Sequence, residues 1–310
     1  MTTNNSPLKI GWAARDVTPQ RPANLMGQFH MRISQGVNDP LTVTALAIAA
    51  QNASGLAAVL LLSGDMAFLP HYVQQGIRDA VHRQVPDLDT AKIIINATHT
   101  HTAPMMEDGF YPPVSPGIMT GKEYADFFIE RAAQALVEAW RGCGKATVAW
   151  GLGHAVVGRN RRAVYFDDLS KRTGYVHSPG TRTTRFAAMY GATNDAQFSH
   201  IEGYEDHSVD LLYTWNNRDE LTGVVGNLAL VSWMGEPFVE AQLALKLKSP
   251  ALYTFVAHLS NGYVGYVPTR LAFRHGGFET RTANWSKLQP GALEAIEKKS
   301  VTLLRKLFST

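Results

Sequence analysis

The chain has 310 residues, of which 45% are hydrophobic and 18% charged, as in a globular protein with a sizeable core. The formal net charge is only +3 and the basic residues are scattered, which argues against a nucleic-acid partner. A single cysteine, Cys143, excludes a disulfide framework and a thiolate metal site. No apolar run approaches the ~20 residues of a transmembrane segment, and the polar N-terminus lacks a signal-peptide pattern. We therefore expect a cytoplasmic protein, or a secreted one if a signal peptide was removed.

Strands and helices alternate along the first half of the chain. Apolar alternation and short apolar runs predict strands at 8–17, 42–50, 57–62, 92–97 and 146–157. Apolar residues at helical spacing predict helices at 69–85 and 123–140. This order predicts an α/β (α+β) fold in which helices flank mixed β-sheets and the functional site lies at the C-terminal edges of strands.

The second half of the chain is less regular. Strands are predicted at 208–215, 221–231 and 253–259, and helices at 237–247 and 290–308. Residues 167–207 show little periodicity, which predicts a long loop of the kind that is often functional. Because no repeat or linker is visible, we expect a single domain over residues 1–310.

Two histidines follow directly on the apolar run Ile93-Ile94-Ile95. His99 and His101 are one residue apart, so an extended backbone would turn both imidazoles to the same face. Such a pair can ligate a metal or contact a substrate, but loop histidines that only bond the backbone are equally common. Spacing alone leaves these alternatives open.

Other candidates also follow predicted strands. Glu236 precedes a predicted helix, where a carboxylate can simply favour the positive helix end. Tyr263 and Tyr266 occupy a glycine-interrupted loop, where packing is the commoner role. Arg161 and its neighbours, among them Arg162, could bind an anionic or carbonyl oxygen, although an exposed basic turn is the default. Residues 200–207 concentrate two histidines and three acids, which suits a cation or a solvated loop.

Taken together, these stretches resemble a known family. Asn-Ala-Thr-His99-Thr-His101-Thr-Ala-Pro is similar to the His-Thr-His-(Ser/Thr)-(Gly/Ala)-Pro signature of the neutral/alkaline (non-lysosomal) ceramidase superfamily. The likeness continues in the same order along the chain, at Asp16-Val17-Thr18-Pro19, Asn160-Arg161, Gly235-Glu236-Pro237-Phe238 and Asn261-Gly262-Tyr263-Val264-Gly265-Tyr266. The resemblance implies a shortened ceramidase-like catalytic domain, a zinc amidase of sphingolipid metabolism that cleaves the N-acyl bond of ceramide.

The resemblance also implies roles for individual residues. It implies Zn²⁺ as cofactor, with His99, Glu236 and Tyr266 as ligands. It implies that His101 and Arg161 act on the substrate.

Three further residues join the predicted site. Tyr263 shares a loop with Tyr266 and is added to the predicted catalytic residues. His30 and Asp65 each lie near a predicted strand edge and are expected to neighbour the site.

The chain departs from the family at one ligand. No histidine occurs between His207 and His258, where the family's second ligand histidine is expected. The family's C-terminal immunoglobulin-like domain also has no counterpart. His200 or His207 is therefore an alternative metal ligand.

These observations predict a zinc-dependent hydrolase of N-acyl amide bonds with a small-molecule substrate, and they leave oligomerisation open. A metal-binding or ligand-binding homologue without turnover is an alternative, favoured by the missing histidine. A hydrolase of small esters or lactones is another, because a scaffold does not fix a substrate.

Overall fold

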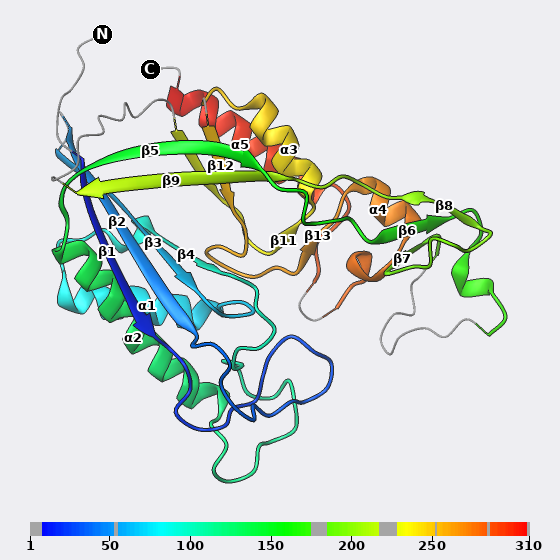
Figure 1. Cartoon of the computed structure of the whole chain (residues 1–310), viewed down its shortest axis with the longest axis horizontal. Coiled ribbons are helices and arrows are strands. Elements are labelled where there is room, and N and C mark those ends of the chain that lie inside the picture. Colours follow the sequence, from blue (N-terminus) through cyan, green and yellow to red (C-terminus); the bar gives the residue numbers. More distant parts are fainter. Residues whose placement is uncertain are drawn as a thin grey trace. The chain divides into compact units, whose positions relative to one another are not determined.

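The computed structural model describes residues 8–52, 55–174, 185–216, 228–251, 253–283 and 286–308. The chain forms two compact units, whose helices and strands are labelled in Figure 1. Unit 1 consists of Met1–Ala149, Leu212–Val225 and His258–Tyr263. Unit 2 consists of Trp150–Leu211, Gly226–Ala257 and Val264–Thr310.

The main sheet begins in unit 1 and has the strand order β4-β3-β2-β1-β5-β9. Strands β1, β2 and β3 pair antiparallel, with the long segment 17–41 between β1 and β2, whereas β4 pairs parallel to β3 after the crossover through α1. The strands are β1 (Lys9–Asp16), β2 (Thr42–Asn52), β3 (Gly55–Gly64), β4 (Ile93–Ala97), β5 (Gly144–His154) and β9 (Ser208–Asn216).

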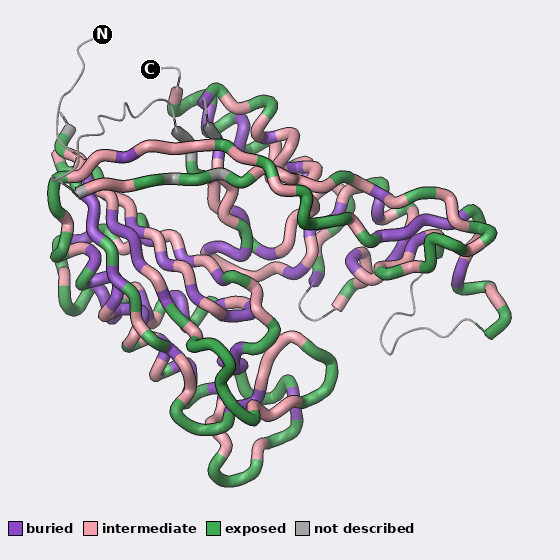
Figure 2. The backbone as a smooth tube through the Cα atoms, in the orientation of Figure 1, coloured by how far each residue is buried: buried purple, intermediate pink, exposed green. Residues whose placement is uncertain are grey.

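Two amphipathic helices, α1 (His71–Gln84) and α2 (Gly121–Arg141), bury the apolar side chains of this sheet. Helix α2 packs on β1 and β2, and α1 packs beside α2. Thr120 and Glu123 form a capping box that fixes the start of α2. The buried positions of these strands alternate along the tube in Figure 2, as expected for a sheet covered on one face. This core holds the C-terminal end of β4 in place.

Unit 2 contains three small sheets. Strand β10 (Leu228–Ser232) pairs parallel with β12 (Tyr253–Ala257), and β11 (Glu236–Pro237) pairs parallel with β13 (Tyr266–Val267). The third sheet has the antiparallel order β7-β6-β8. Its strands are β7 (Ala187–Met189), β6 (Arg162–Tyr165) and β8 (Phe198–Ile201).

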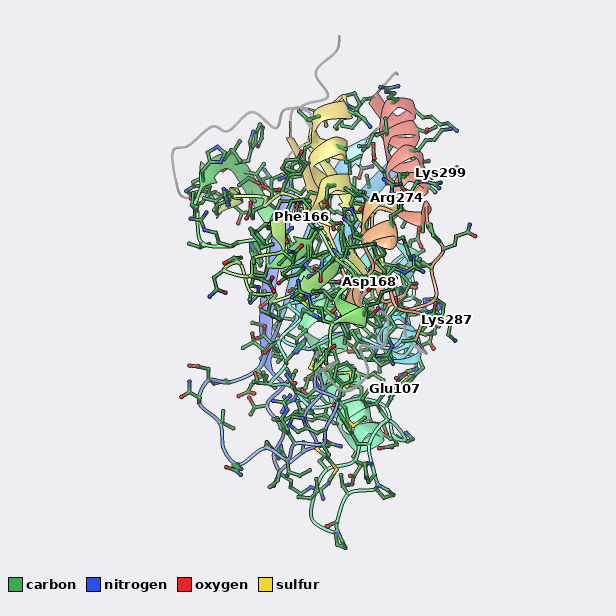
Figure 3. The ribbon with its side chains drawn as sticks, turned by 90° about the vertical axis from the view of Figure 1, so that its right-hand side faces the viewer. Glu107, Phe166, Asp168, Arg274, Lys287 and Lys299 are labelled. Atoms are coloured by element: carbon green, nitrogen blue, oxygen red, sulfur yellow. The ribbon has the colours of Figure 1, made fainter. Side chains whose placement is uncertain are left out.

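Three helices complete unit 2: α3 (Val239–Lys248), α4 (Arg270–His275) and α5 (Ala292–Phe308). In Figure 3, Arg274 lies on α4 and Lys299 on α5. Helices α3 and α5 share an apolar cluster with the buried Trp233, whose indole nitrogen donates to Ser300 Oγ at 2.9 Å. Single-turn 3₁₀ helices lie at Thr90–Lys92, Leu169–Lys171 and Phe278–Thr280.

The predicted fold class is confirmed, and the longer predicted elements lie within a few residues of the observed ones. The prediction of a continuous loop over residues 167–207 was wrong, because β7 and β8 lie within its described part. Strand β6 and helix α4 were also missed, since four to six residues are too few to show a periodicity. Residues 221–227 of one predicted strand lie outside the described residues. The single-domain organisation stays a prediction.

Along the described parts of the chain, none of the helices combines the length and the apolar character needed to cross a membrane.

Candidate functional site

His99 occupies the first bend after β4, with a φ of 65°. This left-handed conformation is uncommon for a residue other than glycine, and the surrounding hydrogen bonds maintain it. The His99 amide donates to the Met66 carbonyl at 2.9 Å, and His99 Nδ1 lies 2.5 Å from the Ala67 carbonyl oxygen. Because a carbonyl can only accept, Nδ1 carries a proton, and in the neutral imidazole Nε2 then carries the lone pair. This is the tautomer that a metal ligand needs.

His101 faces His99, with 3.3 Å between the two Nε2 atoms and 4.8 Å between the ring centres. Its imidazole lies against the backbone of Gly27, where a Cβ atom would approach the ring to 2.4 Å. Gly27 also has a φ of 105°, so glycine is required there on two counts. Arg32 donates to the His101 carbonyl at 2.6 Å and to the Met26 carbonyl at 3.0 Å. The predicted pair is thus held together by its own loop and by the segment around Gly27.

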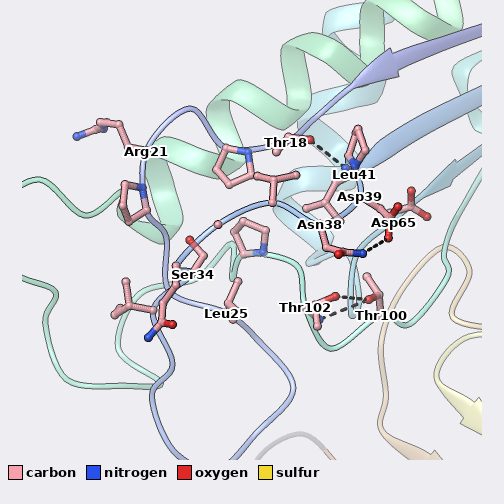
Figure 4. Close-up of a pocket in the computed structure, with 18 of the residues that line it drawn as sticks. Thr18, Arg21, Leu25, Ser34, Asn38, Asp39, Leu41, Asp65, Thr100 and Thr102 are labelled. Carbon is pink, nitrogen blue, oxygen red and sulfur yellow. Dashed lines mark hydrogen bonds between the residues drawn. The ribbon is translucent and has the colours of Figure 1, made fainter.

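A cavity of about 1010 Å³ lies beside this loop in unit 1 (Figure 4). Thr100 and Thr102, on either side of His101 in the chain, form part of its wall, and their hydroxyls are 2.9 Å apart. Most other lining residues come from the segment 18–41 and provide both apolar and polar groups. A small amphipathic molecule would find matching surfaces in this cavity.

Asp65 also lines the cavity, and its hydrogen bonds link the end of β3 to the start of β2. Its carboxylate accepts hydrogen bonds from the Thr42 amide at 2.9 Å and from the Thr42 hydroxyl at 2.8 Å. The Thr98 hydroxyl donates to its other oxygen at 3.3 Å, so Asp65 supports the residue just before His99. His30 is exposed on the segment that forms most of the cavity wall.

The segment His258–Tyr263 runs beside β4 in unit 1. The side-chain oxygen of Asn261 accepts from the Ile95 amide at 3.2 Å and from Arg78 at 2.9 Å. Tyr263 stacks on Phe68 with 4.7 Å between the ring centres. This contact is the packing role that the sequence gave as the alternative for Tyr263, and its catalytic role stays a prediction.

In unit 2, Glu236 and Tyr266 lie directly opposite each other on the paired strands β11 and β13. Gly235, with a φ of 72°, permits this pairing, because a Cβ atom there would lie 2.4 Å from the Gly265 carbonyl oxygen. Burial raises the pKa of Tyr266, and the charges of Glu236 and Glu279 and a hydrogen bond to Glu236 raise it further. Because it pairs with Tyr266 in this way, Glu236 is part of strand β11. Helix α3 begins only at Val239, later than the sequence predicted.

Arg161 is exposed, and its guanidinium lies 4.4 Å from the centre of the Tyr190 ring. The Tyr190 amide donates to the Arg161 carbonyl at 2.9 Å, and Tyr190 has a φ of 59°. Tyr190 also contributes to the raised pKa of Tyr266, which places all three residues in one region of unit 2. The sequence did not single out Tyr190, because a tyrosine in an aperiodic segment carries no signal of its own.

The two alternative metal ligands have other partners. His207 Nε2 lies 3.3 Å from the Gly158 carbonyl oxygen. The ring of His200 lies near that of His275, with 6.3 Å between the centres. Within the described ranges, no group of three or more histidine, cysteine, aspartate or glutamate side chains is placed to hold a metal ion.

The predicted ligands nevertheless suit zinc by their chemistry. Imidazole nitrogens and carboxylate oxygens are common zinc donors. His99, His101 and Tyr263 belong to unit 1, and Arg161, Glu236 and Tyr266 belong to unit 2.

No family model matches the chain, and no curated protein matches it in sequence. Solved structures do match. The neutral ceramidase from Pseudomonas aeruginosa superposes with a TM-score of 0.64 at 12% identity, covering 98% of this chain and 75% of that one. A ceramidase complexed with C2 superposes with a TM-score of 0.63 at 12% identity, covering 98% and 76%. The fold is ceramidase-like. Nearly the whole chain follows this fold, which confirms the fold that the motif resemblance implied.

Proposed function

We propose that this protein is a zinc-dependent hydrolase of N-acyl amide bonds. The observation that carries the proposal is the His99 and His101 pair, whose Nε2 atoms are 3.3 Å apart at the end of β4 in a chain with a ceramidase-like fold. The names of the similar structures favour a lipid amide as the substrate class. The mixed apolar and polar lining of the cavity beside the histidine loop agrees with an amphipathic substrate.

The motif resemblance assigns the zinc to His99, Glu236 and Tyr266. Three protein ligands with one open position are typical of catalytic zinc. Bound zinc would supply Lewis acidity, both at the scissile carbonyl and at the attacking water. His99 is prepared for this role, because the Ala67 carbonyl fixes its tautomer.

The remaining predicted residues act on the substrate oxygen. His101 is oriented by Gly27 and Arg32, and its imidazole would donate a hydrogen bond to the carbonyl as negative charge develops there. The Arg161 guanidinium, steadied by the ring of Tyr190, would stabilise the same charge. A donor of this kind contributes about 3 kcal/mol to transition-state stabilisation in other hydrolases.

The proposal is tested by measuring fatty-acid release from a panel of N-acyl amides by the zinc-loaded protein. We expect release that is lost on adding a chelator and restored by zinc. His101→Ala should lower the rate by about 10²-fold or more. His82→Ala, on the exposed last turn of α1, is the matched control and should leave the rate unchanged.

A second function, zinc binding without turnover, is favoured by the absence of any histidine between His207 and His258. It would be supported if the zinc-loaded protein cleaved none of the amides and none of a set of esters and lactones. If the zinc-loaded protein cleaved esters or lactones but no amides, the proposed zinc site would stand and the substrate class would change to esters or lactones. Full amide activity of His101→Ala would contradict the proposed mechanism itself.

A further inference from the structure

A group of buried charged side chains lies close to strand β6, strand β8 and helix α4 in unit 2. Figure 1 labels these three elements. Arg162 is only 4% exposed and forms ion pairs with Glu202 at 3.3 Å and with Glu279 at 2.6 Å. It also donates to the carbonyl of Ala272 on α4 and to that of Gly276, directly after the helix. The sequence had placed Arg162 in an exposed basic turn, and this was wrong because Arg162 begins β6 and points into unit 2. None of these charges has a role in the proposed hydrolysis.

His275, the last residue of α4, lies against this group. Its Nδ1 is 2.7 Å from a carboxylate oxygen of Glu202, whose side chain is 4% exposed. An ionised carboxylate can only accept a hydrogen bond, so Nδ1 donates, and in the neutral imidazole Nε2 then carries the lone pair that a metal needs. A histidine that donates one ring nitrogen to a carboxylate is the arrangement found behind metal-binding imidazoles.

A second imidazole is within reach of the first. The ring of His200, on β8, is 6.3 Å from the ring of His275 between centres, at an interplanar angle of 74°. Two imidazoles on one tetrahedral zinc ion have centres roughly 5.5 Å apart, which is close to the observed separation. The Nδ1 of His200 lies 3.0 Å from the Ser199 hydroxyl, which can accept a hydrogen bond from it. Within the described residues, no hydrogen bond involves Nε2 of either ring.

The charges around the two rings favour a bound cation. Arg162 is paired with two buried carboxylates, those of Glu202 and Glu279. Among the described residues, Oε1 of Glu202 has no hydrogen-bond partner, although it is buried. Burial raises the pKa of nearby Glu240, and repulsion from Glu202 raises it further. Buried negative charge of this kind is costly unless a positive charge accompanies it.

We propose that the Nε2 atoms of His200 and His275 bind a borderline transition-metal dication such as Zn²⁺, with Glu202 orienting His275. Two nitrogen donors favour this class of metal over Mg²⁺ and Ca²⁺, which take oxygen ligands. His200 is exposed, so water completes the coordination and the ion exchanges with solvent. Binding links β8 to the C-terminal end of α4. The site uses none of the residues to which the proposed function assigns zinc or substrate, which are His99, Glu236, Tyr266, His101 and Arg161. His200 was an alternative ligand for the catalytic zinc in the sequence prediction, and here it is assigned to a separate ion with His275.

Equilibrium dialysis of the chelator-stripped full chain against Zn²⁺ alone tests this site. His200→Ala and His275→Ala should each lose one zinc equivalent, or bind it at least tenfold more weakly, and Glu202→Gln should weaken it. The matched control is His154→Ala, an exposed histidine of the same unit, which should bind like the wild type. His99→Ala should retain this equivalent, which separates the site from the proposed catalytic zinc.

Retention of wild-type zinc stoichiometry and affinity by His200→Ala would overturn the proposal. The same conclusion follows if His200→Ala and His99→Ala abolish one and the same equivalent. Circular dichroism checks the folding of each variant. If His275→Ala fails to fold because Glu202 loses its partner, the exposed His200 position decides the outcome.

Discussion

The two units support their predicted site residues in different ways. In unit 1 the histidine loop follows a strand whose surroundings are apolar, with Phe128 and Ile95 fully buried. In unit 2 the Glu236 and Tyr266 pair has the charged Glu279 nearby, and Glu279 is held by the buried Arg162. The difference indicates that unit 1 is stabilised mainly by burial of apolar surface, and that the region around β6 and α4 depends on complete ion pairing.

The largest expected effect is on the apolar core of unit 1. Phe128→Ala should lower the free energy of unfolding by about 4 kcal/mol, because it leaves a cavity under the sheet. Urea denaturation measures the loss, and hydrogen exchange should show it in β1–β4. Phe166→Ala, at a phenylalanine that is 72% exposed, is the control and should change stability by less than about 0.5 kcal/mol. Equal losses in both variants would contradict an apolar core at Phe128.

A slightly smaller loss is expected on breaking the ionic region of unit 2. Arg162→Ala leaves Glu202 and Glu279 buried without their cation and should destabilise the protein by about 3 kcal/mol. Hydrogen exchange should increase in β6 and β8 rather than in β1–β4. Arg21→Ala removes a surface pair with Glu123 and should have an effect below about 1 kcal/mol. If Arg162→Ala and Arg21→Ala lower the free energy of unfolding equally, the region around β6 and α4 does not depend on its buried ion pairs.

Acid should weaken unit 2 through Asp206. Burial alone raises the pKa of this carboxyl, but hydrogen bonds from Ser208, Lys246 and Gln242 outweigh burial and lower the pKa to about 2. Because the pKa in the folded protein is below the ordinary aspartate value of 3.8, the stabilisation is complete above about pH 4 and is lost as the pH falls toward 2. It amounts to roughly 2 kcal/mol.

Urea denaturation of wild type and Asp206→Asn between pH 2 and pH 6 measures this contribution. The difference in stability between the two proteins should shrink as the pH falls. A difference that does not vary with pH would show that the Asp206 charge contributes nothing to folding.

Much of unit 1 was predictable from the sequence because its elements are long and periodic. The apolar run Ile93-Ile94-Ile95 and the amphipathic pattern of 123–140 identify β4 and α2 directly. His99 and His101 were recognisable because they follow such a strand. What the sequence could not supply is the left-handed bend at His99 or the contact of Gly27 with His101. The first depends on Met66 and Ala67 and the second on Gly27, and all three residues are distant from the histidine loop in sequence.

The site residues of unit 2 were harder to place. Glu236 and Tyr266 meet through a two-residue pairing between strands 30 positions apart, and strands this short have no periodic signal. Arg162 looked exposed because a charged residue is rarely buried, and the partners that permit its burial, Glu202 and Glu279, are distant in sequence. Buried ion pairs are set by tertiary structure and leave no local pattern.

The most direct test of the zinc hydrolase account is a crystal structure of the zinc-loaded chain with anomalous scattering measured at the zinc edge. The account predicts a peak about 2.1 Å from His99 Nε2 and from oxygens of Glu236 and Tyr266. A well-occupied zinc elsewhere, with no peak at His99, would contradict it.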